Sequence, residues 1–214
     1  MMKVLELFAG SRSIGKVAEQ RGHEVFSVDI KDFDGIDLAI DIEELKPDLI
    51  PFSPDMIWAS PPCTTYSIAG IRFHRPIGKL MSNFAYKSDK LVKNVLNLIL
   101  HYKCLYYIEN PRGLLRKQTF MLDLPKTTVW YCKYGDNAAK PTDIWSNNIR
   151  NLFNPYGWQP KTECFNGNEN CHHDKCPRGT NNGLGTQGKN NNYERSKIPV
   201  ELCNDIIYAT EKHF

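Results

Sequence analysis

The stretch KVLELFAGSRSIG, residues 3–15, contains an apolar run that ends in a glycine-containing turn and leads into a helical pattern. The run at residues 4–8 has the length and apolar content of a buried strand, and residues 16–21 continue from the turn as a helix. A strand, a tight turn and a helix in this order are typical of the first half of a β-α-β unit. The start of the chain therefore predicts an α/β fold.

The same rhythm returns along the next hundred residues. Further short apolar runs lie at residues 24–30, 55–59 and 105–108. Before the last run, apolar side chains recur at helical spacing with polar ones on the opposite face. These apolar positions are Leu91, Val95, Leu98 and Tyr102. An amphipathic helix between two apolar runs predicts a crossover, so we expect a mostly parallel sheet with helices on both faces.

The size and charge of the chain limit its class. Its 214 residues are enough for one well-filled core, with or without a small appendage. The 41% of hydrophobic and 24% of charged residues exclude a disordered or fibrous chain. Lys and Arg exceed Asp and Glu by only 27 to 24, so a nucleic acid would have to bind a local basic patch. No window approaches the roughly 18 consecutive apolar residues of a membrane span, and we expect a cytoplasmic protein without a membrane partner.

Composition divides the chain into three segments. We expect residues 1–135 to form the catalytic core. Residues 136–194 are rich in Asn, Gly, Pro and Lys with little periodicity, which predicts a reduced, irregular region that faces the substrate. Within it, residues 179–192 are expected to form a mobile loop. Helical character returns after Pro199, so residues 195–214 are expected to end in a helix that packs on the core.

The turn after the first predicted strand is suited to a ligand. Gly10 and Gly15 allow a close backbone approach, and the start of the next helix offers unpaired N–H groups. The spacing is not G-x-G-x-x-G, which argues against a dinucleotide pyrophosphate. Asp29 ends the next strand, where a carboxylate can accept hydrogen bonds from ribose hydroxyls. A nucleoside-bearing cofactor without a pyrophosphate fits both features, and an ordinary strand-to-helix turn is the alternative.

A second turn, Ser60-Pro61-Pro62-Cys63, follows the apolar run at residues 55–59. Two prolines cannot continue a strand, so they fix the backbone and present Cys63 at the carboxyl edge of the sheet, where α/β folds bind ligands. A cysteine in a rigid polar turn is a candidate nucleophile that reacts as its thiolate. The alternative is a small buried thiol.

A carboxyl group follows the next apolar run at the same edge. If residues 105–108 lie beside residues 55–59, Glu109 lies near Cys63. Desolvation would then favour its protonated form, which could form a hydrogen bond with a ring nitrogen. A lone glutamate at such a position is more often a surface ion-pair partner. Its coincidence with Pro62-Cys63 predicts a catalytic pair.

Three cysteines and two histidines gather within thirteen residues of the irregular segment. Thiolate and imidazole groups can hold a tetrahedral zinc ion and stiffen a region that lacks a core. The predicted ligands are Cys164, Cys171, His172 and Cys176, with His173 beside them. The spacing matches no common C-x2-C finger, so a metal-free loop is the alternative. The odd total of seven cysteines favours a reducing compartment over a disulfide framework.

Taken in order, these motifs resemble those of the DNA (cytosine-5)-methyltransferases. That family carries an F-x-G cofactor loop, a Pro-Cys nucleophile loop and a Glu-Asn motif. The matches here are Phe8-Ala9-Gly10, Pro62-Cys63 and Glu109-Asn110. The resemblance extends over residues 3–113, about half of the chain. It implies an α/β, Rossmann-like fold that depends on S-adenosylmethionine, with a small target-facing region, in a compact phage-type member.

The resemblance also implies the roles of individual residues. S-adenosylmethionine would be the cofactor, and double-stranded DNA with a flipped base would be the substrate. The implied cofactor-binding positions are Phe8, Ala9, Gly10, Ser11, Ser13, Ile14, Gly15, Asp29, Ile30, Asp41, Ile42, Ser60 and Pro61. Cys63 would attack carbon 6 of cytosine and Glu109 would stabilise the charge on the ring, so that carbon 5 can take the methyl group.

The chain departs from the family pattern at three places. Pro111 replaces the usual valine after Glu-Asn. The family's basic strand has no obvious arginine here, and Lys133 is expected to supply its charge as a third catalytic residue. Residues 136–194 are far shorter than the family's target-recognition domain, so we expect limited sequence specificity or a protein partner that supplies it. The basic residues expected to contact DNA phosphates are Arg72, Arg75, Lys133, Lys140 and Arg178.

Three other functions remain open at this point. Ser60-Pro61-Pro62 also resembles the Ser-Pro-Pro-Tyr loop of methyltransferases that modify an exocyclic amine, but here a cysteine follows the prolines. A non-catalytic DNA-binding or anti-restriction protein on the same fold is the second alternative, and the intact Cys63 and Glu109 argue against it. RNA as the substrate is the third, because the same chemistry works on either sugar.

Overall fold

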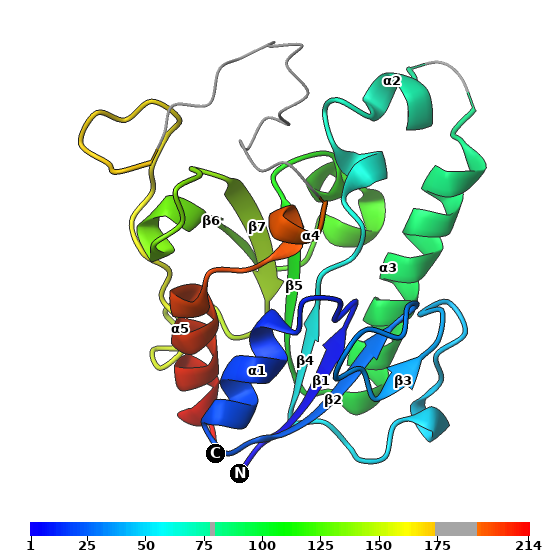
Figure 1. The fold of residues 1–214 in the computed structure, drawn as a ribbon, viewed down its shortest axis with the longest axis vertical. Helices are drawn as coiled ribbons and strands as arrows, with labels where there is room; N and C mark the ends of the chain where they lie inside the picture. Colours follow the sequence, from blue (N-terminus) through cyan, green and yellow to red (C-terminus); the bar gives the residue numbers. More distant parts are fainter. Residues whose placement is uncertain (78–79, 174–191) are drawn as a thin grey trace.

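A computed structural model of the chain describes residues 1–77, 80–173 and 192–214. In this part of the chain, seven strands form one sheet in the order β3-β2-β1-β4-β5-β7-β6 (Figure 1). The strands are β1 (Lys3–Leu7), β2 (Glu24–Asp29), β3 (Leu38–Ala39), β4 (Met56–Ala59), β5 (Leu105–Pro111), β6 (Lys126–Trp130) and β7 (Pro141–Ser146). Strands β1 to β5 pair in parallel, and β7 is antiparallel to both β5 and β6. The predicted mostly parallel sheet is confirmed.

Helices cover both faces of this sheet, as predicted (Figure 1). The helices are α1 (Ser13–Gln20), α2 (Ile71–His74), α3 (Asn83–Tyr102), α4 (Asn192–Ser196) and α5 (Val200–Glu211). Short 3-10 turns are η1 (Pro47–Leu49), η2 (Thr64–Tyr66), η3 (Leu115–Lys117), η4 (Thr119–Met121) and η5 (Tyr131–Tyr134). None of the described helices has the length and apolar character that crossing a membrane requires.

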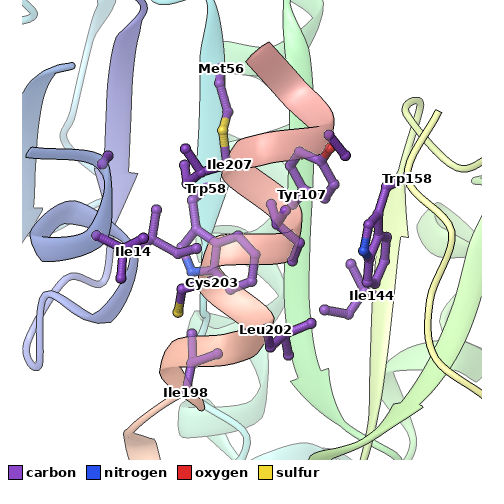
Figure 2. Close-up of a cluster of buried hydrophobic side chains, with 14 of the residues drawn as sticks. Ile14, Met56, Trp58, Tyr107, Ile144, Trp158, Ile198, Leu202, Cys203 and Ile207 are labelled. Carbon is purple, nitrogen blue, oxygen red and sulfur yellow. The ribbon is translucent and has the colours of Figure 1, made fainter. Parts of the chain in front are cut away.

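The alternation of side chains along each central strand builds two cores, one on each face. On one face, Met56 and Trp58 of β4 pack with Ile14 of α1 and with Leu202 and Ile207 of α5 (Figure 2). On the other face, the intervening strand positions pack against α3. These positions include Leu5, Leu7, Ile57 and Ala59. Continuous apolar runs such as Met56–Ala59 therefore indicate strands buried on both sides.

Two predicted helices are confirmed. In α3, Leu91, Val95 and Leu98 are buried against the sheet, and Tyr102 closes the same stripe with its hydroxyl donating to the carbonyl of Pro47. The C-terminal helix α5 begins directly after Pro199, because a proline has no N–H to lose in the first turn. Helix α3 packs on one face of β4 and β5, and α5 packs on the other face.

The segment after residue 135 is less irregular than its composition predicts. Pro141–Ser146 forms β7, which is inserted between β5 and β6 and is almost entirely buried. The expectation of little regular structure is wrong here, because a buried charge hides the strand pattern. Asp143 is fully buried in β7, and its Oδ2 accepts a hydrogen bond from Arg116 Nε at 2.7 Å. The predicted loop at residues 179–192 lies outside the described residues, apart from Asn192 in α4.

Candidate active site

The parallel strands bring three predicted motifs to one edge of the sheet. The carboxyl ends of β1, β4 and β5 lie side by side because these strands pair in parallel. Residues 8–11 follow β1, residues 60–63 follow β4, and Glu109 lies near the end of β5. The register pairs Ala59 with Ile108, so Ser60 and Glu109 occupy neighbouring positions. The cofactor turn and the predicted catalytic pair therefore share one edge.

The turn after β1 is tied to the end of β2. Phe8 and Arg12 both have left-handed backbone conformations, with φ of 58° and 49°. Such conformations cost free energy in residues other than glycine and cluster at functional sites. Asp29 Oδ2 accepts a hydrogen bond from the backbone N–H of Gly10 at 3.0 Å. This contact fixes the carboxylate of Asp29 beside the turn.

A buried carboxyl group that we did not predict lies under the start of α1. Glu6 of β1 is 3% exposed, and its Oε1 accepts a hydrogen bond from the N–H of Ile14 at 3.1 Å. Gly15 is required here, because a Cβ at this position would lie 2.5 Å from Glu6 Oε2. Burial raises the pKa of Glu6 to about 7, although hydrogen bonds from the N–H groups of Gly15 and Ile14 oppose the rise. The N–H groups that we expected to face a ligand are therefore used by Glu6.

The predicted cofactor-binding residues divide into accessible and buried groups. Asp29 is half-buried, Ile30 is 60% exposed, and Phe33 lies beside Gly10 and Asp29 with 38% of its surface exposed. Sequence reasoning missed Phe33. A carboxylate with two exposed apolar side chains fits a nucleoside, because the carboxylate can accept hydrogen bonds from ribose hydroxyls and the apolar groups can cover the base. These three side chains fit the nucleoside part of S-adenosylmethionine.

Other predicted cofactor positions are less accessible. The side chains of Ile14 and Ile42 lie in the two cores and are not available to a ligand. The N–H of Ile14 is used by Glu6, and the carbonyl of Ile42 accepts from Asn94 Nδ2 at 2.6 Å. Ala9 and Pro61 are also buried. Asp41 forms an ion pair with Lys87 at 2.6 Å, which helps to hold the pKa of Asp41 below its usual value. Ser11 and Ser13 are half-buried and share a hydrogen bond of 2.8 Å.

The loop that carries Cys63 is held from the neighbouring strand. Asn110, fully buried in β5, donates from Nδ2 to the carbonyl of Pro61 at 2.8 Å, and its Oδ1 has no hydrogen-bond partner among the described residues. The backbone N–H of Leu114 donates to the carbonyl of Tyr66 at 2.7 Å. Gly113 is needed for this approach, because a Cβ would lie 2.5 Å from the carbonyl oxygen of Tyr66. Both ends of the loop are therefore anchored to the exit of β5.

Cys63 is an exposed residue, in agreement with a nucleophile and against a buried structural thiol. The protein atoms around its thiol nevertheless raise the pKa of Cys63 by desolvation, and the negative charge of Glu109 raises it further. Lys140 and Arg195 act in the opposite direction. The residue is open to solvent at the carboxyl edge of the sheet, and the charges of Glu109, Lys140 and Arg195 act on its thiol.

Glu109 lies at the base of this edge. It is 5% exposed, and the hydroxyl of Tyr131 donates to its Oε1 at 2.9 Å. Desolvation raises the pKa of Glu109, while the charge of Lys140 and hydrogen bonds from Tyr131 and Ser60 oppose the rise. Glu109 is therefore a carboxyl group whose neutral form is favoured by burial and which can donate a hydrogen bond when protonated.

The basic residue next to the pair is Lys140 and not Lys133. Lys140 is 5% exposed, its Nζ donates to the carbonyl of Arg195 at 2.7 Å, and it lies 4.4 Å over the ring of Tyr131. Its charge acts on both Cys63 and Glu109, and Lys133 lies in η5. The burial of Lys140 also contradicts its predicted role as a phosphate contact. No sequence motif marks Lys140, and only its φ of 26° sets it apart in the structure.

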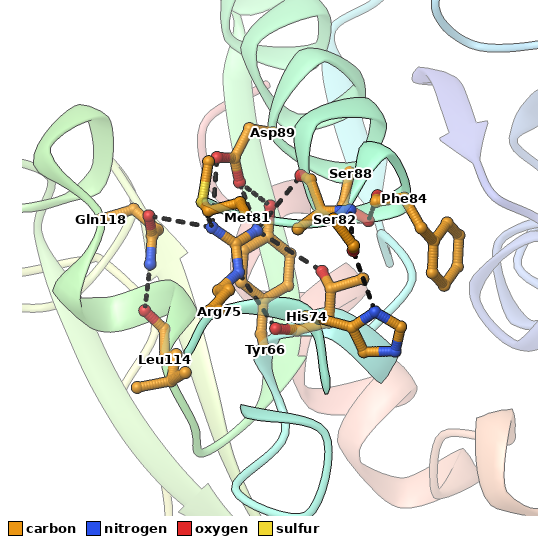
Figure 3. A network of polar contacts seen from close by, with 12 residues as sticks. Tyr66, His74, Arg75, Met81, Ser82, Phe84, Ser88, Asp89, Leu114 and Gln118 are labelled. Carbon is orange, nitrogen blue, oxygen red and sulfur yellow. Dashed lines mark hydrogen bonds and ion pairs between the residues drawn. The ribbon is translucent and has the colours of Figure 1, made fainter. Parts of the chain in front are cut away.

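Arg75 is a second predicted phosphate contact that the structure contradicts. It is buried, forms an ion pair with Asp89 at 2.6 Å, and donates to the carbonyl of Thr65 at 3.0 Å (Figure 3). Its guanidinium lies 4.4 Å over the ring of Tyr66, whose hydroxyl donates to Asp89. Arg75 therefore fastens the turn after Cys63 to α3. Arg72 is exposed and remains available to a phosphate, and Arg178 lies outside the described residues.

The cysteine and histidine residues group differently from the prediction. Cys164 and Cys171 lie together with His173 and with Cys132 of η5, which the sequence did not indicate. His172 instead lies 3.1 Å from the carbonyl oxygen of Asp136 through its Nε2. His172 is therefore not part of the group. Cys176 lies outside the described residues.

Comparison with known proteins agrees with this geometry. Residues 2–122 match the family of C-5 cytosine-specific DNA methylases. The protein named probable DNA (cytosine-5)-methyltransferase of Frog virus 3 (isolate Goorha) is 31% identical over 182 residues, which cover 79% of this chain and 78% of that protein.

Two solved structures resemble the chain at low sequence identity. One is an E. coli prophage protein described as a DNA modification methyltransferase, with a TM-score of 0.54 and 14% identity over 77% of this chain and 52% of that chain. The other is the S. pombe Dnmt2 methyltransferase, with a TM-score of 0.49 and 15% identity over 68% of this chain and 49% of that chain. The chain spans about half the length of these structures.

The likeness to the prophage structure shows the fold alone and confirms the predicted methyltransferase fold. The family match is longer than half of the chain and includes the turns that carry Gly10, Cys63 and Glu109. The viral relative extends the similarity beyond that region. The chain therefore belongs to the C-5 cytosine-specific DNA methylase family.

Proposed function

We propose that the chain transfers a methyl group from S-adenosylmethionine to carbon 5 of cytosine in double-stranded DNA, through a transient bond between Cys63 and a flipped base. The observation that carries this proposal is the pairing of Cys63 and Glu109 at neighbouring strand ends, where the charge of one acts on the thiol of the other. S-adenosylmethionine, when bound, supplies an electrophilic methyl group. Asp29, Ile30 and Phe33 are the side chains that would hold its nucleoside.

Cys63 overcomes the low reactivity of the base. Carbon 5 of a neutral pyrimidine is a poor nucleophile. When the sulfur of Cys63 bonds to carbon 6, the electron pair of the 5,6 double bond moves toward carbon 5. Carbon 5 could then bond to the methyl carbon as the bond between that carbon and the sulfonium sulfur breaks, and S-adenosylhomocysteine would leave. Loss of the proton from carbon 5 and cleavage of the bond between sulfur and carbon 6 restore the ring and free Cys63.

Glu109 and Cys63 are coupled through their charges. Burial favours the neutral form of Glu109, and a neutral carboxyl group can donate a hydrogen bond to ring nitrogen 3 as negative charge develops on the base. A neutral Glu109 also no longer raises the pKa of Cys63, while Lys140 and Arg195 continue to favour the thiolate. Binding of the base against Glu109 therefore promotes ionisation of the nucleophile at the moment when it is needed.

The position of this pair requires the base to leave the duplex. Neighbouring base pairs cover both faces of a stacked cytosine, so Cys63 can attack carbon 6 only after the nucleotide has rotated out of the helix. Exposed basic side chains such as Arg72 would hold the flanking phosphates without reading the sequence. A separate protein partner would supply sequence specificity, in keeping with the short segment after residue 135.

The test uses duplex DNA in which 5-fluorocytosine replaces cytosine, together with S-adenosylmethionine labelled in its methyl group. Fluorine cannot leave carbon 5 as a proton does, so the covalent intermediate accumulates. We expect a labelled protein–DNA adduct that survives denaturation and disappears in Cys63→Ala. Cys104→Ala is the matched control, because Cys104 precedes β5 at the opposite edge of the sheet.

The alternatives give different results in the same assay. Label transfer to ordinary DNA that is equal in Cys63→Ala and the wild type would favour methylation of an exocyclic amine. DNA binding without transfer or adduct would favour a non-catalytic protein. An adduct with 5-fluorocytosine RNA but not with DNA would change the substrate and keep the mechanism.

A further inference from the structure

Four potential metal ligands meet at a point outside the catalytic pair. Cys132 comes from η5, and Cys164, Cys171 and His173 come from the later loop. One ligand atom from each lies within 4.8 Å of all the others. The side chains of Cys132, Cys164 and His173 are buried. These four residues, named the Cys3His cluster below, join two segments that are more than thirty residues apart.

The side chains of the cluster favour metal binding over a disulfide. All three cysteines are free thiols, so the cluster is not a disulfide site. In a tetrahedral zinc site, thiolate sulfurs bond to the metal at about 2.3 Å and lie about 3.8 Å from one another. Cys164 Sγ and His173 Nδ1 already lie 3.9 Å apart. A small contraction therefore brings the four ligands to zinc-binding distances.

We propose that Cys132, Cys164, Cys171 and His173 bind one structural zinc ion. Three thiolates and one imidazole complete a tetrahedral shell and leave no open position for a substrate, as in structural zinc sites. Asn168 Nδ2 donates to Cys164 Sγ at 3.4 Å, which is the kind of outer contact that orients a metal ligand. In the structure the N–H of Gly167 donates to His173 Nε2 at 3.3 Å. Binding through Nδ1 places the ring proton on Nε2, so this one contact is exchanged for a metal bond.

The loop at residues 164–173 has little other structure to hold it against the end of β6. Among the described residues, the small core around the cluster adds only Trp130 and Ala139 as buried apolar side chains beside Cys132 and Cys164. Between residues 147 and 173, the described backbone pairs only through two isolated bridges. A segment with so small a core is commonly stabilised by a metal ion. Zinc would fasten the loop at residues 164–173 to the end of β6.

The cluster also adjoins the catalytic site through one peptide bond. Cys132 follows Tyr131, whose hydroxyl donates to Glu109. Zinc bound to Cys132 would therefore hold the backbone that positions Tyr131. Zinc binding by the cluster requires neither this link nor the reaction proposed above. The test below measures bound metal and not methyl transfer.

The experiment measures zinc in the purified full-length chain by mass spectrometry of the metal. We expect one zinc per chain in the wild type and loss of bound zinc in Cys132→Ser and His173→Ala. The controls His172→Ala, Cys104→Ser and Cys176→Ser are expected to retain the metal. Absence of zinc from the wild type, or loss of zinc in His172→Ala or Cys176→Ser with retention in His173→Ala, would overturn the proposed ligand set.

A second measurement covers variants that fail to fold. The wild-type chain is stripped with a chelator and titrated with Co²⁺ alone, which reports coordination through its visible spectrum. We expect intense bands of tetrahedral, thiolate-bound cobalt at one equivalent, and their disappearance when Zn²⁺ is added. A weak octahedral spectrum, or no saturation at one equivalent, would refute the site.

Discussion

Glu6 makes the stability of this fold depend on pH in an unusual direction. Its carboxyl lies under α1 and has a pKa of about 7, against an ordinary value of 4.5, because burial penalises the charged form. Between pH 4.5 and 7 the folded chain therefore binds more protons at this site than the unfolded chain does, so the free energy of unfolding falls as the pH rises through this window. At about 1.4 kcal/mol for each pH unit, the loss amounts to about 3 kcal/mol.

The variant Glu6→Gln isolates this effect, because glutamine has nearly the same shape and does not ionise. Urea unfolding of both proteins from pH 4.5 to 8 gives the difference in unfolding free energy at each pH. We expect this difference to shift by about 3 kcal/mol in favour of Glu6→Gln across the range. Glu24→Gln, an exposed change in β2, controls for the loss of a carboxyl group. A difference that does not vary with pH would show that Glu6 titrates alike in both states and would refute the reasoning.

Three further substitutions test the site. Arg75→Ala leaves the half-buried Asp89 without its ion-pair partner, and we expect it to lower the free energy of unfolding in urea by about 3 kcal/mol. The exposed control Arg72→Ala should lower it by less than about 0.5 kcal/mol, and equal effects would contradict the role of Arg75 in holding the turn to α3. Lys140→Met should slow single-turnover methyl transfer by roughly 100-fold or more, and Lys133→Met by less than about tenfold if Lys140 holds the catalytic position. Asn110→Ala removes the hydrogen bond to Pro61, and adduct formation should slow by about 10- to 100-fold while the far-ultraviolet circular dichroism stays unchanged.

The central strands could be predicted from the sequence because each is buried on both faces, so apolar residues dominate it and polar ones such as Glu6 are few. Met56–Ala59 is an example, with all four side chains buried. β7 could not be predicted in this way, because its pattern includes a proline and a buried aspartate. The charge of Asp143 is balanced by Arg116, which is distant in sequence and becomes its neighbour only when β7 pairs with β5 and β6.

Within the site, the motifs that lie directly at strand ends were predictable, and residues that depend on tertiary partners were not. Cys63 and Glu109 follow adjacent parallel strands, so the strand order alone brings them together. Arg75 is a basic residue of the kind that contacts phosphates, but it forms an ion pair with Asp89 of α3 instead. Cys132 belongs to a stretch that reads as a strand, and only the return of the later loop brings the other metal ligands to it.

The position of β7 explains why Lys140 lies beside Glu109. β6 ends at Trp130, which pairs with Pro141 at the start of β7, so the connection between these strands lies at the carboxyl edge of the parallel sheet. Tyr131 begins this connection and Lys140 ends it, and both side chains act on Glu109. Lys133 lies within the same connection, in η5. A connection that begins and ends beside Glu109 can therefore supply a hydrogen-bond donor from one end and a positive charge from the other. Cys132, which lies between these ends, belongs to the proposed zinc site. This arrangement predicts that shortening the connection would displace both contacts together, so loss of transfer should accompany loss of bound zinc.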